Sequence, residues 1–589
     1  MKKFILGFFA IIGALVMLTI ISIVVLVKYP AVNTMSVPDN TILQINFDRE
    51  IIEVSGDNLS GIFFKKTMAL DEVIRTIGQA RKDPKIIGIV AKINDPKMGV
   101  AQIQEIRNAV IKFRTARKNT PNFTIAYSDS FGELSQGTGA YYLASAFEEV
   151  WMQPMGTVGF TGIAMELPFA KEALEKLHIK PQIGKRKSYK TFIDTITESG
   201  LTPENKESMQ GVLNSLTGQI VHDVALTREL NDSEVQEAMN HAPLSGKEAL
   251  TLGLIDRVAH FDTIEKHISQ KAGKPISIIS FNKYKKSIVK QTHKPGMPKI
   301  TLVYGTGTIF QDNDEGETDP LDEMAMGSHE TAKAIDEAAK DPDVKAIVFR
   351  INSGGGSSIA SETIRRSIEL AKLAGKKVVV SMSDVAGSGG YWIAVNADKI
   401  VANPATITGS IGVYAGKIVT QDFWKNLGIN WEEVHVGDNA TMYLNTKEYT
   451  EYGWKRLQSN LDDIYANFVN LVATNRKLTK EHVEEIAQGR IWAGPEALKF
   501  GLVDKLGDLS DAINVARTEA GLEKEVIYVD VSPKKLSFIE KLFSSMFGQE
   551  ESMRVHIPFF NVLIELEKGY RSILAAAQST IMPVGKPKG

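Results

Sequence analysis

The chain repeats its own sequence pattern at an interval of about 250 residues. Residues 83–90 read DPKIIGIV and residues 341–348 read DPDVKAIV, while ALTLGLID at 249–256 returns as ALKFGLVD at 497–504. Solenoid repeats have periods of roughly 20–50 residues, so copies this far apart are duplicated domains. The duplication predicts two related domains in tandem, and it allows equivalent positions of the two copies to be compared directly.

Bulk composition narrows the function classes. The chain has 589 residues, more than the roughly 250–300 at which one hydrophobic core stops growing, so it should hold more than one core. It has no cysteine, which excludes disulfides, cysteine metal sites and a thiol nucleophile. The net charge of −2 gives no reason to expect nucleic acid as a partner, and no histidine pair has the spacing of a zinc site.

Apolar runs alternate with segments of helical spacing in both copies. Residues 86–93 and 346–351 are nearly continuous apolar stretches, as in strands that are covered on both faces of a sheet. Each is followed by a segment with helical character, at 101–115 and 360–373. This alternation predicts an α/β fold with a largely parallel sheet in each copy. The expected division is an N-terminal anchor at 1–28, a first α/β repeat at 29–280, a linker at 281–298, a second α/β repeat at 299–532 and a C-terminal extension at 533–589.

The N-terminus is predicted to cross a membrane. Residues 4–27 contain no charge, and Lys2 and Lys3 precede them. About 20 apolar residues span a bilayer as a helix, whereas a secretory signal has an apolar stretch of roughly 7–15 residues. Because positive residues favour the cytoplasmic side, we expect the N-terminus inside the cell and both copies outside.

The two copies differ at residues that could carry out chemistry. MGTVG in the first copy corresponds to TGSIG in the second, so Thr157 stands where the second copy has Ser410. Lys187 in the first copy corresponds to Ala440 in the second. A serine is a poor nucleophile until a base takes its proton, and a lysine can be that base only when burial lowers its pKa. A serine and a lysine that are each missing from the other copy indicate one active site built from both.

Local sequence leaves other candidates open. Lys185 and Lys190 lie in the same basic segment as Lys187, and nothing local separates the three. Ser388 lies between two glycines, but the first copy keeps a hydroxyl residue in the same pattern, which fits a helix N-cap better than a nucleophile. His435 is an alternative base for the serine, although a lone histidine in an apolar strand context is more often structural.

A glycine run in the second copy could bind an anion. Gly354, Gly355 and Gly356 follow the strand that ends near residue 351, and the first copy has no such run. Backbone N–H groups in a loop of this kind bind phosphate or stabilise an oxyanion. The chain lacks the Gly-x-x-x-x-Gly-Lys-Ser/Thr pattern, which disfavours a nucleoside triphosphate site.

Four segments of the second copy carry motifs of a known family: IVFRINS at 347–353, GSGGYWI at 387–393, VANP at 401–404 and TGSIG at 408–412. With them, the chain resembles the long, duplicated form of the bacterial signal peptide peptidase A (protease IV) family. The resemblance implies that the serine of Thr-Gly-Ser, Ser410, is the nucleophile and that the lysine of Gly-x-x-Lys-Ser, Lys187, is its base. It also implies a fold related to Clp protease and the crotonases, and a bowl-shaped homotetramer.

The expected protein is a membrane-anchored serine endopeptidase with a Ser–Lys dyad, which degrades released signal peptides and other short apolar peptides. Backbone N–H groups of Gly355 and Gly389 would stabilise the oxyanion, although Gly354 stands where the family usually has proline. No cofactor and no metal are expected, and the partners are peptides, membrane lipid and further copies of the chain. The expected location is the bacterial inner membrane, with a single pass and the catalytic domains outside. The alternatives are a crotonase-like acyl-CoA enzyme and a non-catalytic membrane scaffold.

Overall fold

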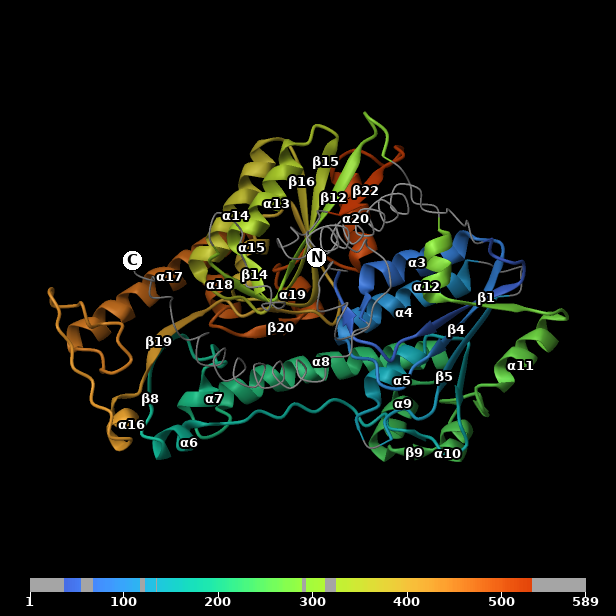
Figure 1. The fold of residues 1–589 in the computed structure, drawn as a ribbon, viewed down its shortest axis with the longest axis horizontal. Helices are drawn as coiled ribbons and strands as arrows, with labels where there is room; N and C mark the ends of the chain where they lie inside the picture. The colour runs from blue at the N-terminus through green and yellow to red at the C-terminus, as the bar shows by residue number, and fades with distance from the viewer. Residues whose placement is uncertain are drawn as a thin grey trace, which may run out of the picture.

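The computed structural model describes residues 36–54, 67–116, 122–133, 135–288, 293–312 and 325–531. The predicted anchor at 4–27 and the predicted extension at 533–589 lie outside these residues. Within the described ranges, no helix combines the length and the apolar character needed to cross a membrane. Helices and strands alternate along both copies, which confirms the expected α/β fold (Figure 1).

The first copy is built on a six-stranded parallel sheet. Its strands are β1 (Thr41–Asn46), β4 (Ile86–Lys92), β5 (Phe123–Ser128), β6 (Glu149–Met152), β10 (Arg257–Val258) and β11 (Ser277–Ser280). They pair in the order β10-β6-β5-β4-β1-β11. Neighbouring parallel strands need crossover connections, and helices supply them here. The helices between these strands include α3 (Leu70–Lys82), α4 (Val100–Thr115), α5 (Thr138–Ala144), α9 (Asp232–His241), α10 (Gly246–Thr251) and α11 (Thr263–Ala272).

The second copy repeats this sheet and extends it. Its strands β12 (Lys299–Thr306), β15 (Val344–Ser353), β16 (Lys377–Gly387), β17 (Lys399–Ala402), β21 (Lys505–Leu506) and β22 (Tyr528–Val531) pair in the matching order β21-β17-β16-β15-β12-β22. The first part of β16 pairs with β17, and its last residues pair with β18 (Ile407–Gly409). Strand β20 (Ile491–Ala493) then pairs antiparallel to β18. Strand β16 therefore runs past the sheet common to both copies.

The remaining elements complete the two copies. Those of the first copy are β2 (Ile51–Ile52), β3 (Met68–Ala69), β7 (Thr157–Val158), β9 (Leu244–Ser245), α6 (Lys171–Lys176), α7 (Asp194–Thr197) and α12 (Phe281–Ser287). Those of the second copy are β13 (Thr308–Phe310), β14 (Ala325–Gly327), α13 (Ser328–Lys340), α14 (Ser358–Leu373), α15 (Gly389–Ala394), α16 (Gln421–Asn426), α18 (Lys480–Ile486), α19 (Gly494–Lys499) and α20 (Leu509–Glu519).

Each sheet is buried on both faces. In β4, Ile86 and Ile89 belong to one apolar cluster, while Ile87 and Val90 belong to another on the opposite face. Successive side chains of a strand point to opposite faces, so a strand covered on both sides needs apolar residues at every position. This requirement explains why the strands appear in the sequence as continuous apolar runs.

A ribbon of two strands joins the copies. Strand β8 (Lys180–Arg186) of the first copy pairs antiparallel with β19 (Val413–Val419) of the second, with Arg186 opposite Val413. The ribbon lies next to the long helix α17 (Glu451–Arg476), and the equivalent helix of the first copy is α8 (Pro203–Arg228). In Figure 1 the ribbon lies at the left, well away from the first sheet. It carries the end of a first-copy strand to the edge of the second copy.

Buried charges also link the copies. The guanidinium of Arg350 on β15 is fully buried, and it lies 2.8 Å from the carboxylate of Glu53 and 2.6 Å from that of Glu105. Both glutamates belong to the first copy. Asp384 on β16 accepts a hydrogen bond of 2.9 Å from the N–H of Ala101, in the first turn of α4. Charged groups are rarely buried without partners, so these contacts hold the two copies in one relative position.

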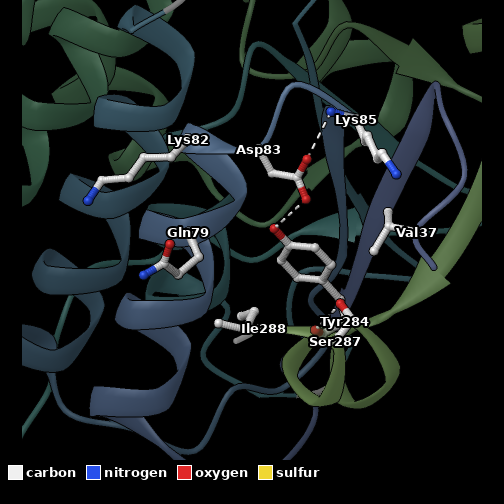
Figure 2. A pocket seen from close by; sticks show the side chains of 8 residues that line it. All are labelled: Val37, Gln79, Lys82, Asp83, Lys85, Tyr284, Ser287 and Ile288. Atoms are coloured by element: carbon white, nitrogen blue, oxygen red, sulfur yellow. Dashed lines mark hydrogen bonds between the residues drawn. The ribbon is translucent and has the colours of Figure 1, made fainter. Parts of the chain in front are cut away.

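The predicted linker begins with a helix. Phe281 and Tyr284 of α12 are buried in the first core. The hydroxyl of Tyr284 donates to the carboxylate of Asp83 at 3.1 Å, in a pocket between α3 and α12 (Figure 2). The residues at 281–287 therefore belong to the first copy and not to a linker. No predicted site residue lines this pocket.

Candidate active site

Lys190 of the first copy contacts two serines of the second. Its Nζ lies 2.9 Å from Ser388 Oγ, 2.9 Å from Ser410 Oγ and 3.0 Å from the Ser410 carbonyl oxygen. Ser388 directly precedes α15 and Ser410 directly follows β18. The ends of β16 and β18 pair with Gly387 beside Gly409, which brings the two serines together. One amine thus meets two hydroxyls that are 198 and 220 residues away in the chain.

The segment after β8 carries Lys190 to this position. The N–H of Tyr189 donates to the carbonyl of Gln488 at 3.1 Å. Gly489 lies so close to the segment that a Cβ there would be 2.4 Å from the backbone nitrogen of Lys190. Its φ of +86° is also one that glycine adopts without steric cost. A glycine at 489 is therefore what allows the Lys190 segment to pack against the second copy.

Burial changes the acid–base properties of Lys190. The residue is only 4% exposed, and it pairs with no carboxylate in the described part of the chain. Burial without a counter-charge disfavours the ammonium form, and it lowers the pKa of Lys190 from 10.5 to about 7. At neutral pH a large fraction of Lys190 is therefore an amine, whose lone pair can accept a proton.

Ser388 occupies an unusual turn between β16 and α15. Its φ of 54° and ψ of −119° are sparsely populated by residues other than glycine. Ser388 stands at the N-cap position of α15, as expected, but its side chain makes no capping hydrogen bond. A serine on a sharp turn from strand to helix is the arrangement found in nucleophile elbows, where the hydroxyl is presented to substrate.

Two backbone N–H groups lie beside Ser388. The N–H of Gly355, a predicted oxyanion donor, already donates to Ser353 Oγ at 3.1 Å. Among the residues that the structure describes, the N–H groups of Gly356 and Gly389 have no hydrogen-bond partner. A Cβ on Gly389 would lie 3.1 Å from the nitrogen of Gly356, so these two groups are close together. The geometry retains Gly389 and replaces Gly355 with Gly356 as the candidate donors.

Ser410 is surrounded more tightly by backbone. Its own N–H donates to the carbonyl of Arg490 at 2.7 Å. A Cβ on Gly409 would lie 3.0 Å from that same carbonyl oxygen, and one on Gly412 would lie 2.9 Å from the Cα of Gly489. The N–H of Ser410 is thus taken by the backbone, whereas the N–H groups of Gly356 and Gly389 beside Ser388 have no partner in the described residues.

The sequence motif predicts that Lys187 contacts Ser410, but the structure places Lys187 elsewhere. Its Nζ lies 3.4 Å from the carboxylate of Glu484 and 5.1 Å from the ring centre of Tyr465, and its side chain is 45% exposed. The candidate base is therefore corrected from Lys187 to Lys190. Lys185, the third lysine of the segment, forms an ion pair with Asp194.

No local signal in the sequence could have selected Lys190. The three lysines share one basic segment, and only the contact with residues 488–490 of the second copy distinguishes the last of them. The Gly-x-x-Lys-Ser match points to Lys187, three positions before the lysine that contacts the two serines. The alternative base His435 is exposed, on the segment between α16 and α17.

Comparisons with known proteins agree with the duplication. The pattern of Peptidase family S49 matches residues 130–274 and 371–523, one region in each copy. Protease 4 of Salmonella typhi is 30% identical over 519 residues, which cover 86% of this chain and 79% of that protein. The chloroplastic serine protease SPPA of Arabidopsis thaliana is 27% identical over 504 residues, covering 83% of this chain and 72% of that protein. ClpP1 from Listeria monocytogenes aligns with 38% of this chain and 94% of its own, at 17% identity and a TM-score of 0.21.

Proposed function

This chain belongs to peptidase family S49 and is a serine peptidase, and we propose that Ser388 is its nucleophile and Lys190 the base that activates it. The observation that carries the proposal is the contact of 2.9 Å between Lys190 Nζ and Ser388 Oγ. A buried lysine with a pKa of about 7 has the property that a general base needs at neutral pH. Membership of a peptidase family favours hydrolysis of peptides over the acyl-CoA chemistry and the scaffold role considered from sequence.

The free amide groups favour Ser388 over Ser410 as the nucleophile. Acyl transfer needs donors aimed at the oxygen of the attacked carbonyl, and such donors commonly include the N–H of the residue after the nucleophile. For Ser388 that residue is Gly389, and the N–H of Gly356 lies beside it. Both serines have a positive φ, 54° at Ser388 and 51° at Ser410, so the sign of φ does not separate them, and the assignment rests on the free amide groups.

Ser410 has a supporting role in this proposal. A neutral amine has two N–H groups and one lone pair. The carbonyl oxygen of Ser410 can only accept, so one N–H of Lys190 points to it. Both hydroxyls lie 2.9 Å from the nitrogen, and in this proposal Ser410 accepts the second N–H while the Ser388 hydroxyl donates to the lone pair. Ser410 thus orients the base, and the sequence prediction of Ser410 as nucleophile gives way to Ser388.

The chemical steps follow from this arrangement. Lys190 takes the proton of Ser388 as Oγ attacks the peptide carbonyl carbon, and the N–H groups of Gly356 and Gly389 bind the resulting oxyanion. The carbon–nitrogen bond then breaks, and Lys190 returns the proton to the leaving amine. Water attacks the acyl-enzyme ester with Lys190 again as base, which releases the second product and restores the serine.

The remaining features of the predicted function stay proposals. Residues 4–27 would anchor the enzyme in a bacterial inner membrane with a single pass, and both copies would lie on the outer face. The apolar run and the lysines at its start support this anchor. Substrates among released signal peptides, and assembly into a homotetramer, rest on the family resemblance.

Labelling with a fluorophosphonate tests which serine attacks. We expect the reagent to modify the side chain of Ser388, to fail with Ser388→Ala, and to react more slowly but at the same site with Ser410→Ala. Lys190→Ala should also lose labelling, because the hydroxyl is then not activated. Modification of Ser410 in the wild-type enzyme, with undiminished labelling of Ser388→Ala, would reverse the roles of the two serines.

A further inference from the structure

The segment that carries Lys190 is closed by an ion pair. Lys185 lies on β8 and Asp194 begins α7, and their side chains meet at 2.5 Å between Nζ and Oδ1. Lys190 lies between them in the chain. We propose that Lys185 and Asp194 are positioning residues, which hold the loop between them in the shape that places Lys190 against the two serines. This inference rests on the proposed role of Lys190 as base.

Burial makes this ion pair unlike the exposed pairs of the chain. The side chain of Asp194 is fully buried and that of Lys185 is 30% exposed. A buried carboxylate that loses its partner leaves an uncompensated charge, which costs far more than the loss of an exposed ion pair. The second oxygen of Asp194 accepts a hydrogen bond of 3.3 Å from Thr202, the N-cap of the long helix α8. The pair therefore fixes the loop to both the ribbon and α8.

Backbone hydrogen bonds transmit this constraint to Lys190. The N–H of Asp194 donates to the carbonyl of Thr191 at 3.0 Å, and the N–H of Thr191 donates to the carbonyl of Tyr189 at 2.9 Å. The N–H of Lys190 itself donates to the carbonyl of Lys187 at 3.3 Å. These tight turns leave little freedom between the ion pair and the base, so a displaced Asp194 displaces Lys190.

The charged groups around the loop have partners of their own. Lys187 pairs with Glu484 of α18. Arg490, which follows the Gly489 contact, pairs with Glu207 of α8 at 2.8 Å. The hydroxyl of Tyr189 donates to the same glutamate. Lys190 itself faces Ser388 and Ser410, and burial alone accounts for its lowered pKa. The depth of Lys190, set by the loop, is then what keeps its amine available near neutral pH.

Two variants of the pair separate positioning from direct electrostatics. If the pair acts by holding the loop, Lys185→Met and Asp194→Asn both let water reach Lys190, and both raise its pKa toward 10.5. If the pair acted only through its charges, losing the cation would raise the pKa of Lys190 and losing the carboxylate would lower it. The direction of the two shifts is therefore decisive.

The measurement is the pH profile of kcat/KM for a model peptide with the full-length enzyme. We expect the midpoint to rise by at least about one pH unit in both variants, with kcat/KM at pH 7 reduced about fivefold and largely recovered at the alkaline plateau. Lys185→Arg should keep the wild-type midpoint, because arginine can form the same ion pair with Asp194. Lys187→Ala is the matched control: it removes a neighbouring lysine whose partner is exposed, and it should leave midpoint and rate unchanged.

Other outcomes overturn the inference. Shifts in opposite directions for the two variants, or a wild-type midpoint in both, would show that the pair does not position the base. Should Asp194→Asn fail to fold, as judged by circular dichroism, Asp194→Glu replaces it: this variant keeps the charge but lengthens the side chain, so a raised midpoint supports positioning and a wild-type midpoint overturns it. Lys190→Ala separates this inference from the proposed function. If that variant keeps wild-type activity, the dyad itself is wrong; if it is inactive while the pair variants keep the wild-type midpoint, only the positioning role is wrong.

Discussion

Lys190 Nζ lies 2.9 Å from Ser388 Oγ, and the two residues come from different copies of a duplicated domain. The ribbon of β8 and β19 and the contact with Gly489 bring the lysine across. Ser410 is at the same distance from the amine, so distance alone does not rank the two hydroxyls. The free N–H groups of Gly356 and Gly389 lie beside Ser388, and they favour Ser388 over Ser410 as the nucleophile.

Lys190 and its neighbour Lys187 should differ sharply in their importance for catalysis. We expect Lys190→Ala to lower kcat/KM by a factor of about 100 to 10,000, the range typical for loss of a general base. Lys187→Ala should stay close to wild type, because Lys187 contacts the exposed Glu484. Steady-state hydrolysis of a fluorogenic peptide measures both. Activity that survives Lys190→Ala but is lost in Lys187→Ala would restore the base predicted from sequence.

The pH dependence of hydrolysis should report Lys190. Burial lowers its pKa to about 7, and only the neutral amine accepts a proton, so kcat/KM should rise with pH through a midpoint near 7. A free lysine would give a midpoint near 10.5. A histidine base would titrate in a similar range, so His435→Ala provides the control. The midpoint should be unchanged in His435→Ala, and a profile that loses its acidic limb there would identify a histidine base instead.

The shape of the glycine loop should depend on Ser353. Its buried hydroxyl accepts from the N–H of Gly355 and donates to the carbonyl of Gly307 at 2.6 Å. Ser353→Ala removes both bonds next to the proposed oxyanion donor Gly356, and we expect kcat to fall about tenfold or more. Ser357→Ala is the control at the other end of the loop, where the hydroxyl caps α14. That variant should lower thermal stability by about 1 kcal/mol with little change in kcat.

Asp384 should make stability depend on pH. Burial, with the nearby Glu53, raises the pKa of Asp384 from 3.8 to about 7 in the folded protein. Between these values the folded state binds more protons than the unfolded state, so this group's contribution to stability falls as pH rises from about 4 to 7. Asp384→Asn removes the titrating group, so the folded protein no longer loses stability by ionising a buried carboxyl at this position. Each pKa unit corresponds to about 1.4 kcal/mol, so we expect a gain of at least ~1 kcal/mol at pH 8. Denaturation of both proteins at pH 5 and pH 8 measures it, and an equal difference at the two pH values would contradict the assignment.

Removal of the N-terminal segment tests the proposed anchor. The full-length chain should sediment with membranes, while a chain that begins after Lys28 should stay in the supernatant and keep its peptidase activity. Protease added outside spheroplasts should reach both copies. Recovery of the shortened chain in the membrane fraction would place the membrane contact elsewhere in the protein.

The fold was largely predictable because its signals are local. Strands such as β4 and β15 are covered on both faces and therefore appear as apolar runs. The sequence repeat predicted two related domains with largely parallel sheets, and the two sheets share a matching strand order. The start of the predicted linker was wrong, because Phe281 and Tyr284 of α12 pack into the first core. Nothing in the lysine-rich composition of that stretch reveals such packing.

The candidate site was predictable only in part, because its geometry depends on contacts between distant segments. Comparison of the copies identified Ser410, which contacts Lys190, and it predicted a site shared by both halves, where the structure has a lysine of the first copy against two serines of the second. Sequence left Lys190 open beside Lys187, and it named Gly356 in the glycine run without selecting it as a donor. Only tertiary contacts separate these residues from the predicted ones. Lys190 differs from Lys187 because it is buried beside Gly489. Gly356 differs from Gly355 because its N–H does not donate to Ser353.

The pairing of β8 with β19 has a consequence for the order in which the enzyme is made. On the ribosome, Lys190 emerges while Ser388 and Ser410 have yet to be added, and β8 has no partner strand until residues 413–419 follow. A nascent chain that has finished its first sheet therefore lacks both serines of the proposed site. If the proposed dyad is the active site, hydrolysis becomes possible only when the second copy has folded and the ribbon has closed, so the order of the chain itself delays activity.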